Sequence, residues 1–588
     1  MRPAIKRLLL VGTAAALAIP AIAQVQNTVA APTVSNTPAP ATQPAQPDPG
    51  PQPAQTETRP ETVSGEAEQE TLNQPPPTPI EYPRFARRDP FTAGALDPRQ
   101  LGIGGDPWGM ASGVFLSSLM RQMDTPVASR WLHIGLRGAL LAAAHSPRGV
   151  NPVDWAAERA WLLLRMGEAD AARMVISSVD TDRFTPKMTQ VAVQSALANS
   201  DPLALCAIGD GLRKAEPRIV AIVQAICSGL NGESELASAQ IESARRRGPI
   251  GGIDLALAQK VVGATSDSGT ATTIEWEPVE ALTAWRYGLA TATAMSPPAR
   301  LLDSATPRLR AWHARAPLIP FQDRLESARI ATGLGVFSSR ALIDFYSWIY
   351  DSTDPNELGG SDAWQLRLAF AANDQGTRLA AMRQLWRLGG DRLQREASRA
   401  MLATAASRIQ PARQIQGDAS NLIASMLAAG LDSQAARWTD VVGQMDGGDA
   451  DTAWAMLALG APDGAGVDVS PGRVNAFIGR DSSKGRKRSA LLVAGLAALG
   501  RLDAGAASRL NSRHGLNIGR SSRWTHMIDA AARRDQTGSV LVLAGTGLQA
   551  ADFESLPSSQ LFHIVMALRN SGQEFLARMV AAEALART

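Results

Sequence analysis

Histidines are the first candidates for metal binding or acid–base chemistry, and the chain has six of them. No two lie four residues apart, the spacing that places two imidazoles on one helical face as zinc ligands. The sequence also lacks a G-x-S-x-G nucleophile elbow, a phosphate-binding loop and a G-x-G-x-x-G motif behind a strand. We therefore predict no catalytic residue, no cofactor and no metal site among the histidines, which are His133, His145, His313, His514, His526 and His563.

Two groups of acidic residues could also do chemistry. Glu275 and Glu277 flank Trp276, and a pair of carboxylates beside an aromatic ring suits glycoside cleavage. We favour the simpler interpretation, negative charge at a helix start before Pro278. The second group has oxygen ligands that would suit calcium, but its spacing does not fit an EF-hand loop, so we interpret it as a solvated turn. Its members are Asp351, Asp354, Asn356, Glu357 and Asp362.

The chain has only two cysteines, Cys206 and Cys227. They flank a predicted helical hairpin that turns near residues 215–217, at similar distances from the turn. In an oxidising compartment such a pair is expected to form a disulfide. The alternative is two separately buried thiols. A redox-active pair is disfavoured because the close C-x-x-C spacing is absent.

Basic residues are mostly arginine, since only six of the 58 cationic residues are lysine. We attribute this bias to the base composition of the genome. Close-set cations occur at residues 245–247 and 484–488. We place both runs at helix C-termini, where positive charge is favourable, and keep as the alternative the docking of an anionic envelope polymer or lipid headgroup. The net charge of +3 does not indicate a nucleic-acid partner.

The first 23 residues have the organisation of a secretory signal. Arg2, Lys6 and Arg7 precede the apolar run 8–19, and the sequence Ala-Ile-Ala ends at Ala23. Cleavage near Ala23 would make the protein periplasmic or secreted. The apolar run is shorter than the roughly 20 residues that span a bilayer, so we expect membrane attachment only if the segment is retained.

Residues 24–90 form a proline-rich segment that contains fifteen of the chain's 37 prolines. Few large apolar side chains are available there to offset the entropy of ordering the backbone. We predict a disordered linker with local polyproline II character.

Beyond residue 90, apolar residues recur with helical periodicity almost throughout. The pattern of residues 153–166 predicts a helix on which little more than Glu158, Arg159 and Arg165 is exposed to solvent. Start signals combine a capping side chain with proline, and stop signals are glycines that follow apolar runs. The start pairs are 106–107, 151–152, 185–186 and 201–202, and the stop glycines are Gly167, Gly232, Gly430, Gly500 and Gly572.

A glycine followed five residues later by alanine recurs at four of these turns. The sequences that begin at Gly167 and Gly572 match best, with Ala172-Arg-Met-Val and Ala577-Arg-Met-Val, and those at Gly232 and Gly430 match more loosely. This pattern resembles tetratricopeptide (TPR) helical repeats. The resemblance implies stacked antiparallel hairpins, but the spacing of 34 residues and the aromatic signature of the first repeat helix are missing.

We therefore predict an all-α fold, an α-solenoid with helical-repeat blocks at 91–265 and 278–588. The polar stretch 262–277 separates the two blocks. Such a fold is typical of a non-catalytic scaffold that binds protein partners in the bacterial envelope. One alternative is a glycan-cleaving enzyme that acts on the cell wall with carboxylates that only the fold brings together. Glu554-Ser555 is similar to the Glu-Ser of lytic transglycosylases, but the Gly-Leu-Gln element that follows it in those enzymes is absent downstream. The other alternative is a membrane-anchored spacer.

Overall fold

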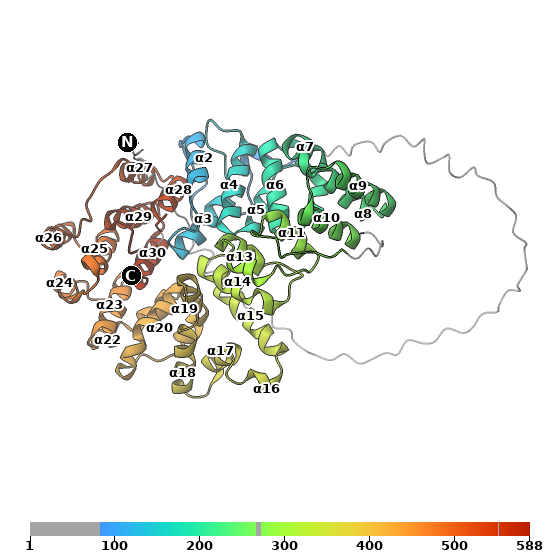
Figure 1. Ribbon diagram of the computed structural model, residues 1–588. Coiled ribbons are helices and arrows are strands. Elements are labelled where there is room, and N and C mark those ends of the chain that lie inside the picture. Colours follow the sequence, from blue (N-terminus) through green and yellow to red (C-terminus); the bar gives the residue numbers. More distant parts are fainter. Residues whose placement is uncertain (1–82, 266–271, 551) are drawn as a thin grey trace, which may run out of the picture. The chain divides into compact units, whose positions relative to one another are not determined.

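Every regular element in the described part of the chain is a helix, which confirms the all-α prediction. The computed structural model describes residues 83–265, 272–550 and 552–588, and residues 88–588 form one compact unit (Figure 1). The predicted signal segment 1–23 and most of the predicted linker 24–90 lie outside the described residues.

The first half of the body consists of the following helices, which are joined mostly by short connections, with the segment 266–283 as the longest. They are α2 (Gly113–Gln122), α3 (Arg130–Leu141), α4 (Pro152–Met166), α5 (Ala169–Ile176), α6 (Pro186–Ala198), α7 (Gly209–Ala215), α8 (Val220–Leu230), α9 (Ser234–Arg247), α10 (Gly252–Thr265), α11 (Ala284–Ala292), α12 (Ala299–Asp303), α13 (Pro307–Ala314), α14 (Phe321–Leu334), α15 (Ser339–Ser352) and α16 (Pro355–Leu358).

The second half continues in the same way. Its helices are α17 (Asp362–Ala371), α18 (Gln375–Trp386), α19 (Arg392–Ser407), α20 (Gln416–Ala428), α21 (Asp432–Ala436), α22 (Thr439–Val442), α23 (Gly448–Gly460), α24 (Pro471–Arg480), α25 (Lys487–Ala498), α26 (Ala504–His514), α27 (Arg523–Ala532), α28 (Thr537–Gly547), α29 (Ser558–Asn570) and α30 (Glu574–Ala586).

Helix stops are predicted better than helix starts. All five stop glycines have positive φ and follow a helix, as expected for a left-handed C-terminal residue. The starts at Asn151 and Thr185 are also correct, because each caps a helix whose first residue is proline. Asp201 instead caps a short 3₁₀ helix. Asp106 accepts from Gly109 N in a turn, and the first long helix begins later, at Gly113.

Helix α4 is more deeply buried than the sequence predicts. Glu158 is 3% exposed and Arg159 is fully buried, so the expectation that both face solvent is wrong. The reason is that α4 packs against α2, α3, α5, α6 and α13, which surround it. Glu158 pairs with Lys187 at 2.7 Å, and Arg159 donates to the carbonyl oxygens of Leu140 and Ala142 at the end of α3.

Each of the four glycine–alanine turns joins two helices that pack on each other. The pairs are α4 with α5, α8 with α9, α20 with α21 and α29 with α30. The alanine five residues after each glycine is fully buried, since a methyl group permits close approach of the two helices. Gly167 is constrained further, because a Cβ there would lie 2.7 Å from the Cβ of Ala311 on α13.

The predicted interruption at 262–277 is shorter than expected. Helix α10 continues to Thr265, residues 266–271 lie outside the described residues, and 272–277 have no regular structure. Helix packing is present on both sides of this segment, where α11 contacts α6 and α10. That the two helical blocks are separate folding units stays a prediction.

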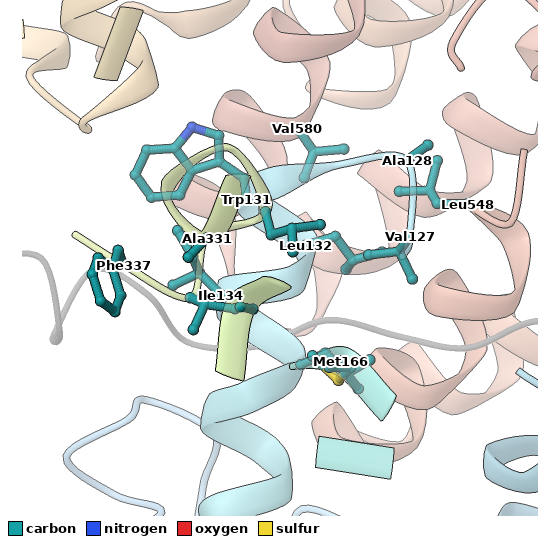
Figure 2. Packing of buried hydrophobic residues seen from close by; sticks show 14 of the residues in the cluster. Val127, Ala128, Trp131, Leu132, Ile134, Met166, Ala331, Phe337, Leu548 and Val580 are labelled. Carbon is teal, nitrogen blue, oxygen red and sulfur yellow. The ribbon is translucent and has the colours of Figure 1, made fainter. Parts of the chain in front are cut away.

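Helices from the beginning and end of the body pack together. Helix α3 contacts α28 and α30, and α2 contacts α28 (Figure 1). An open repeat array would have contacts between neighbouring repeats only. Figure 2 shows the apolar side of this junction, where side chains from α3, α4, α14 and the C-terminal helices meet. Its labelled residues include Leu132, Ile134, Met166, Ala331, Leu548 and Val580.

A buried carboxylate joins α30 to the N-terminus of α3. Glu583 accepts hydrogen bonds from the backbone N–H groups of Arg130 at 2.8 Å and Trp131 at 3.3 Å, and from the hydroxyl of Ser129. These N–H groups have no partner within the helix, and the positive end of the helix dipole favours a negative charge there. Glu583 therefore acts as a long-range cap for α3.

The Arg130 side chain extends this junction to the middle of the chain. Its Nε donates to the carbonyl of Thr332 on α14 at 2.9 Å, and its Nη1 donates to that of Ala428 on α20 at 2.7 Å. Burial lowers the pKa of Arg130 to about 10, although the charges of Glu583 and Glu396 oppose this shift. Arg587 forms ion pairs with both of these carboxylates, Glu396 and Glu583.

The predicted disulfide between Cys206 and Cys227 is present, with a Cα–Cα distance of 5.7 Å. The first cysteine lies in the 3₁₀ helix Pro202–Ile208 and the second in α8, so the hairpin around the bridge is less regular than expected. No helix in the described ranges is both long and apolar enough to cross a membrane.

Removing the Glu583 carboxylate should lower the stability of the whole helical fold. Glu583→Ala leaves two N–H groups and the Arg587 charge buried without this carboxylate, so the free energy of unfolding should fall by about 3 kcal/mol. The measurement is urea denaturation followed by circular dichroism. Glu574→Ala is the control on the same helix, because that carboxylate is 49% exposed and its loss should cost less than about 1 kcal/mol. Equal losses in the two variants would contradict the assigned role of Glu583.

Replacing both cysteines by serine should lower stability through the unfolded state. The bridge closes a loop between residues 21 apart, and the chain-entropy model gives about 3 kcal/mol for a loop of this length. Thermal unfolding of the double variant and the parent, with intact mass measured without reductant, tests the prediction. Two free thiols in parent protein from an oxidising compartment would refute the bridge.

Candidate functional site

The acidic pair beside Trp276 does not form a cleft. Glu275 and Glu277 are exposed, and neither side chain makes an ion pair within the described residues. The backbone carbonyls of Trp276 and Glu277 accept from Arg300 Nη2 instead. These observations fit a solvated chain segment better than a pair of catalytic carboxylates. The interpretation as charge at a helix start is also wrong, because residues 277–278 form a turn and α11 begins only at Ala284.

The other acidic candidates lie in a tight turn or in helices. The solvated turn predicted for the second group is wrong, because Asp351 lies in α15, Glu357 in α16 and Asp362 at the start of α17. Ser555 donates its N–H and its hydroxyl to Asp552, which makes Glu554-Ser555 part of a tight turn. Asp354 caps α16 by accepting from Asn356 N at 2.8 Å. Burial raises the pKa of Asp362, against the opposing charge of Arg329. The described residues contain no group of three or more His, Cys, Asp or Glu side chains that could hold a metal ion.

His133 belongs to a buried ion network rather than to a metal site. Its Nε2 lies 3.0 Å from Glu168 Oε1, and Arg137 donates to the same oxygen at 3.0 Å. Burial acts to raise the pKa of Glu168, but Arg137 and His133 outweigh it, so the pKa lies below its ordinary value. A carboxyl held ionised in this way is poorly suited to act as a general acid.

His313 is fully buried on α13 and lies beside a serine hydroxyl that is also hydrogen-bonded to an arginine. Its Nδ1 lies 3.0 Å from Ser327 Oγ, which also accepts from Arg310 Nε at 2.9 Å. His313 Nε2 has no hydrogen-bond partner among the described residues. Burial, with the charges of Arg310 and Arg324, lowers the pKa of His313 to about 4.

The basic run at 484–488 does not lie where the sequence analysis places it. Lys484–Arg486 form a 3₁₀ turn, and Lys487 is the first residue of α25. The run is therefore at a helix N-terminus, where positive charge is unfavourable, and the electrostatic explanation from a C-terminus is wrong for it. Arg486 also has a left-handed backbone conformation, with φ 54° and ψ 41°, which costs a non-glycine residue about 1 kcal/mol.

Arg486 of the 3₁₀ turn and Arg513 of α26 both lie near His514. Arg486 Nη1 lies 3.1 Å from His514 Nδ1, and His514 Nε2 lies 3.0 Å from Asn475 Oδ1 on α24. Burial lowers the pKa of His514, and the charges of Arg486 and Arg513 lower it further. Arg509 precedes Arg513 by one helical turn on α26, so the two share a face. We call Lys484, Arg486, Arg509 and Arg513 the cationic surface.

These four residues are exposed and have no carboxylate partner within the described ranges. Residues 471–525 carry eleven lysines and arginines but only two aspartates, whereas the whole chain has a net charge of +3. The sequence pattern indicates the 484–488 run but not the arginines of α26, which are not close-set. Counting charge by segment would have found them, because the excess is local and is cancelled by acidic residues elsewhere.

Buried His313 should make stability depend on pH. The unfolded chain binds a proton near pH 6.5 and the folded chain only near 4, so stability is full above 6.5 and falls as the pH drops. Between pH 7 and pH 5 this one group should cost about 2 kcal/mol. Urea denaturation at both pH values measures it, and His313→Gln should reduce the difference by that amount. A His526→Gln control should leave it unchanged, and an equal pH dependence in parent and His313→Gln would contradict the assignment.

Comparison with known proteins identifies no relative of this chain. No family model matches the chain, and no curated protein and no solved structure matches it. The function must therefore be inferred from this chain's own geometry, in which the cationic surface is the feature that internal packing does not explain.

Proposed function

We propose that the protein is an exported, non-catalytic α-helical scaffold of the bacterial cell envelope, and that its cationic surface binds an acidic region of a partner protein. The observation that carries the proposal is the cationic surface itself. These four exposed cations form no ion pair within the described residues, and like charges so placed raise the free energy of the isolated protein. An acidic partner removes that repulsion.

A scaffold is also supported by carboxylates elsewhere in the body that arginines neutralise internally. Glu168 is held by Arg137 and His133, and Asp451 is held by Arg473 at 2.9 Å and by Arg480 at 2.6 Å. The hydrogen bonds from these arginines outweigh burial, so the pKa of Asp451 also lies below its ordinary value. Such carboxylates stabilise the frame, while the unpaired cations remain available for another molecule.

We further propose that the body is an α-solenoid of TPR-like hairpins whose two ends meet. The four glycine–alanine turns between packed helices support repeated hairpins. The contacts of α3 with α28 and α30 would fix the hairpins relative to one another. A fixed frame binds with a smaller loss of conformational entropy than a flexible array.

The proposed compartment follows from the sequence of residues 1–23. Cleavage after Ala23 would leave a mature protein that begins at Gln24, in the periplasm or outside the cell. N-terminal sequencing of protein recovered from the envelope tests this. A chain that keeps residues 1–23 and remains with the membrane would support the anchored spacer instead.

Charge reversal at the cationic surface should abolish partner binding. The tagged mature protein is incubated with envelope extract, and bound proteins are identified by mass spectrometry at low and at moderate salt. Arg486→Glu/Arg509→Glu should lose the acidic partner that the parent captures, and capture by the parent should decrease with salt because exposed charges are screened.

The control is Arg99→Glu/Arg148→Glu, which reverses two exposed arginines outside the cationic surface. It should bind as the parent does. Capture that is identical in the parent and in Arg486→Glu/Arg509→Glu would reject the docking role. Capture of glycan or lipid without any protein would reject the proposed partner class, and turnover of a cell-wall glycan by the purified parent would reject a non-catalytic function.

A further inference from the structure

A cleft of about 470 Å³ opens between α4, α12, α13 and the segment that leads into α11. Ligand sites for small molecules commonly have volumes of about 300 to 1,000 Å³. At about 30 Å³ for each water in the liquid, the cleft holds the equivalent of about 15 water molecules. It therefore has room for a small organic molecule but not for a folded partner.

The floor of the cleft is apolar and fixed. Leu164 and Leu301 are each 1% exposed, and Trp312 is held by Tyr287, with ring centroids 6.0 Å apart. Trp161 is only partly buried and supplies an indole surface on α4. Two indoles with leucine side chains between them provide a surface on which a planar or short aliphatic group loses contact with water. Leu282 and Leu309 complete this apolar lining.

Positive potential is concentrated at one side of the cleft, where α13 begins. Thr306 and Arg308 line the cleft at the first turn of α13, which contains no acidic residue. Arg308 is exposed and forms no hydrogen bond or ion pair through its side chain in the described part of the chain. A cation at a helix N-terminus adds to the positive end of the helix dipole instead of opposing it. An anion placed there would be favoured by both charges.

Arg165 adds a second cation to the lining. Its Nη1 donates to the carbonyls of Met120 and Arg121 at 3.1 Å, so backbone oxygens rather than carboxylates satisfy it. Burial lowers the pKa of Arg165, and repulsion from Arg308 acts in the same direction, while Asp124 and Glu158 oppose it. The two guanidinium groups are thus close enough to repel each other. Glu280 is the single carboxylate in the lining.

We propose that this cleft binds a small amphiphilic anion, whose acidic head lies at the first turn of α13 beside Arg308 and Arg165 and whose apolar body lies against Trp161 and Trp312. The site is separate from the cationic surface, so it does not depend on the proposed scaffold function. The charge at α13 sets the preference for an anion, and the two indoles set the preference for an apolar body.

Three indole compounds that differ in charge test the proposal on the mature chain. Indole-3-acetate carries the negative head, tryptamine carries a positive one and 3-methylindole carries none. Isothermal titration calorimetry should show binding of indole-3-acetate at least about tenfold tighter than that of tryptamine, with 3-methylindole between them, because a charge-assisted hydrogen bond is worth this much or more. Equal affinities for the anion and the cation, or no binding of indole-3-acetate at millimolar concentration, would overturn the proposal.

Two variants locate the site. Arg308→Glu should reverse the preference, weakening indole-3-acetate by about tenfold or more and strengthening tryptamine, whereas Arg520→Glu, an exposed arginine outside the cleft, should change neither. Trp161→Ala should weaken all three compounds, whereas Trp348→Ala, a 47% exposed tryptophan on α15, should not. Circular dichroism of each variant verifies the fold. Unchanged indole-3-acetate affinity in folded Arg308→Glu would overturn the proposal.

Discussion

The unpaired backbone N–H groups at the start of α3 are the constraint on which the body depends. They are buried, so they must be hydrogen-bonded, and residues near them in sequence supply only the Ser129 hydroxyl. The remaining acceptor comes from Glu583, 453 residues away from Arg130. Because Arg130 then reaches α14 and α20, one local requirement of a helix end fixes the beginning, middle and end of the chain together. Figure 2 shows the apolar contacts at the same junction, among them Leu132 of α3 and Val580 of α30.

At helix C-termini, arginine side chains donate to the backbone carbonyls that have no partner within the helix. Arg165 donates to the last carbonyls of α2, Arg159 to those of α3, and Arg501 to Ala458 and Ala461 at the end of α23. A guanidinium has five donors in a rigid planar fork, so one side chain can satisfy several carbonyls that point the same way. A lysine ammonium lacks this geometry. The excess of arginine over lysine, first attributed to base composition, thus has a structural use in this fold.

The sequence predicts what local chemistry decides. Turn glycines, helix caps with proline and the Cys206–Cys227 bridge follow from residues near one another, and the structure contains them. The sequence does not predict burial or contacts that depend on segments far apart in the chain. Glu158 and Arg159 look like the solvent face of α4 until α2 and α3 cover them, and Glu583 looks like one more charge on an alanine-rich helix. The cationic surface and the cleft at α13 are of the same kind, since their residues come together only when several helices pack.

The junction between α3 and α30 also has a consequence for biosynthesis. A ribosome makes α3 well before α30, because Glu583 follows Ser129 by 454 residues. Until α30 has been made, the first helices have neither their cap nor the apolar surface of α28 and α30 to cover them. Long-range contacts of this kind slow folding and leave apolar surface exposed in folding intermediates, which makes such intermediates prone to aggregation.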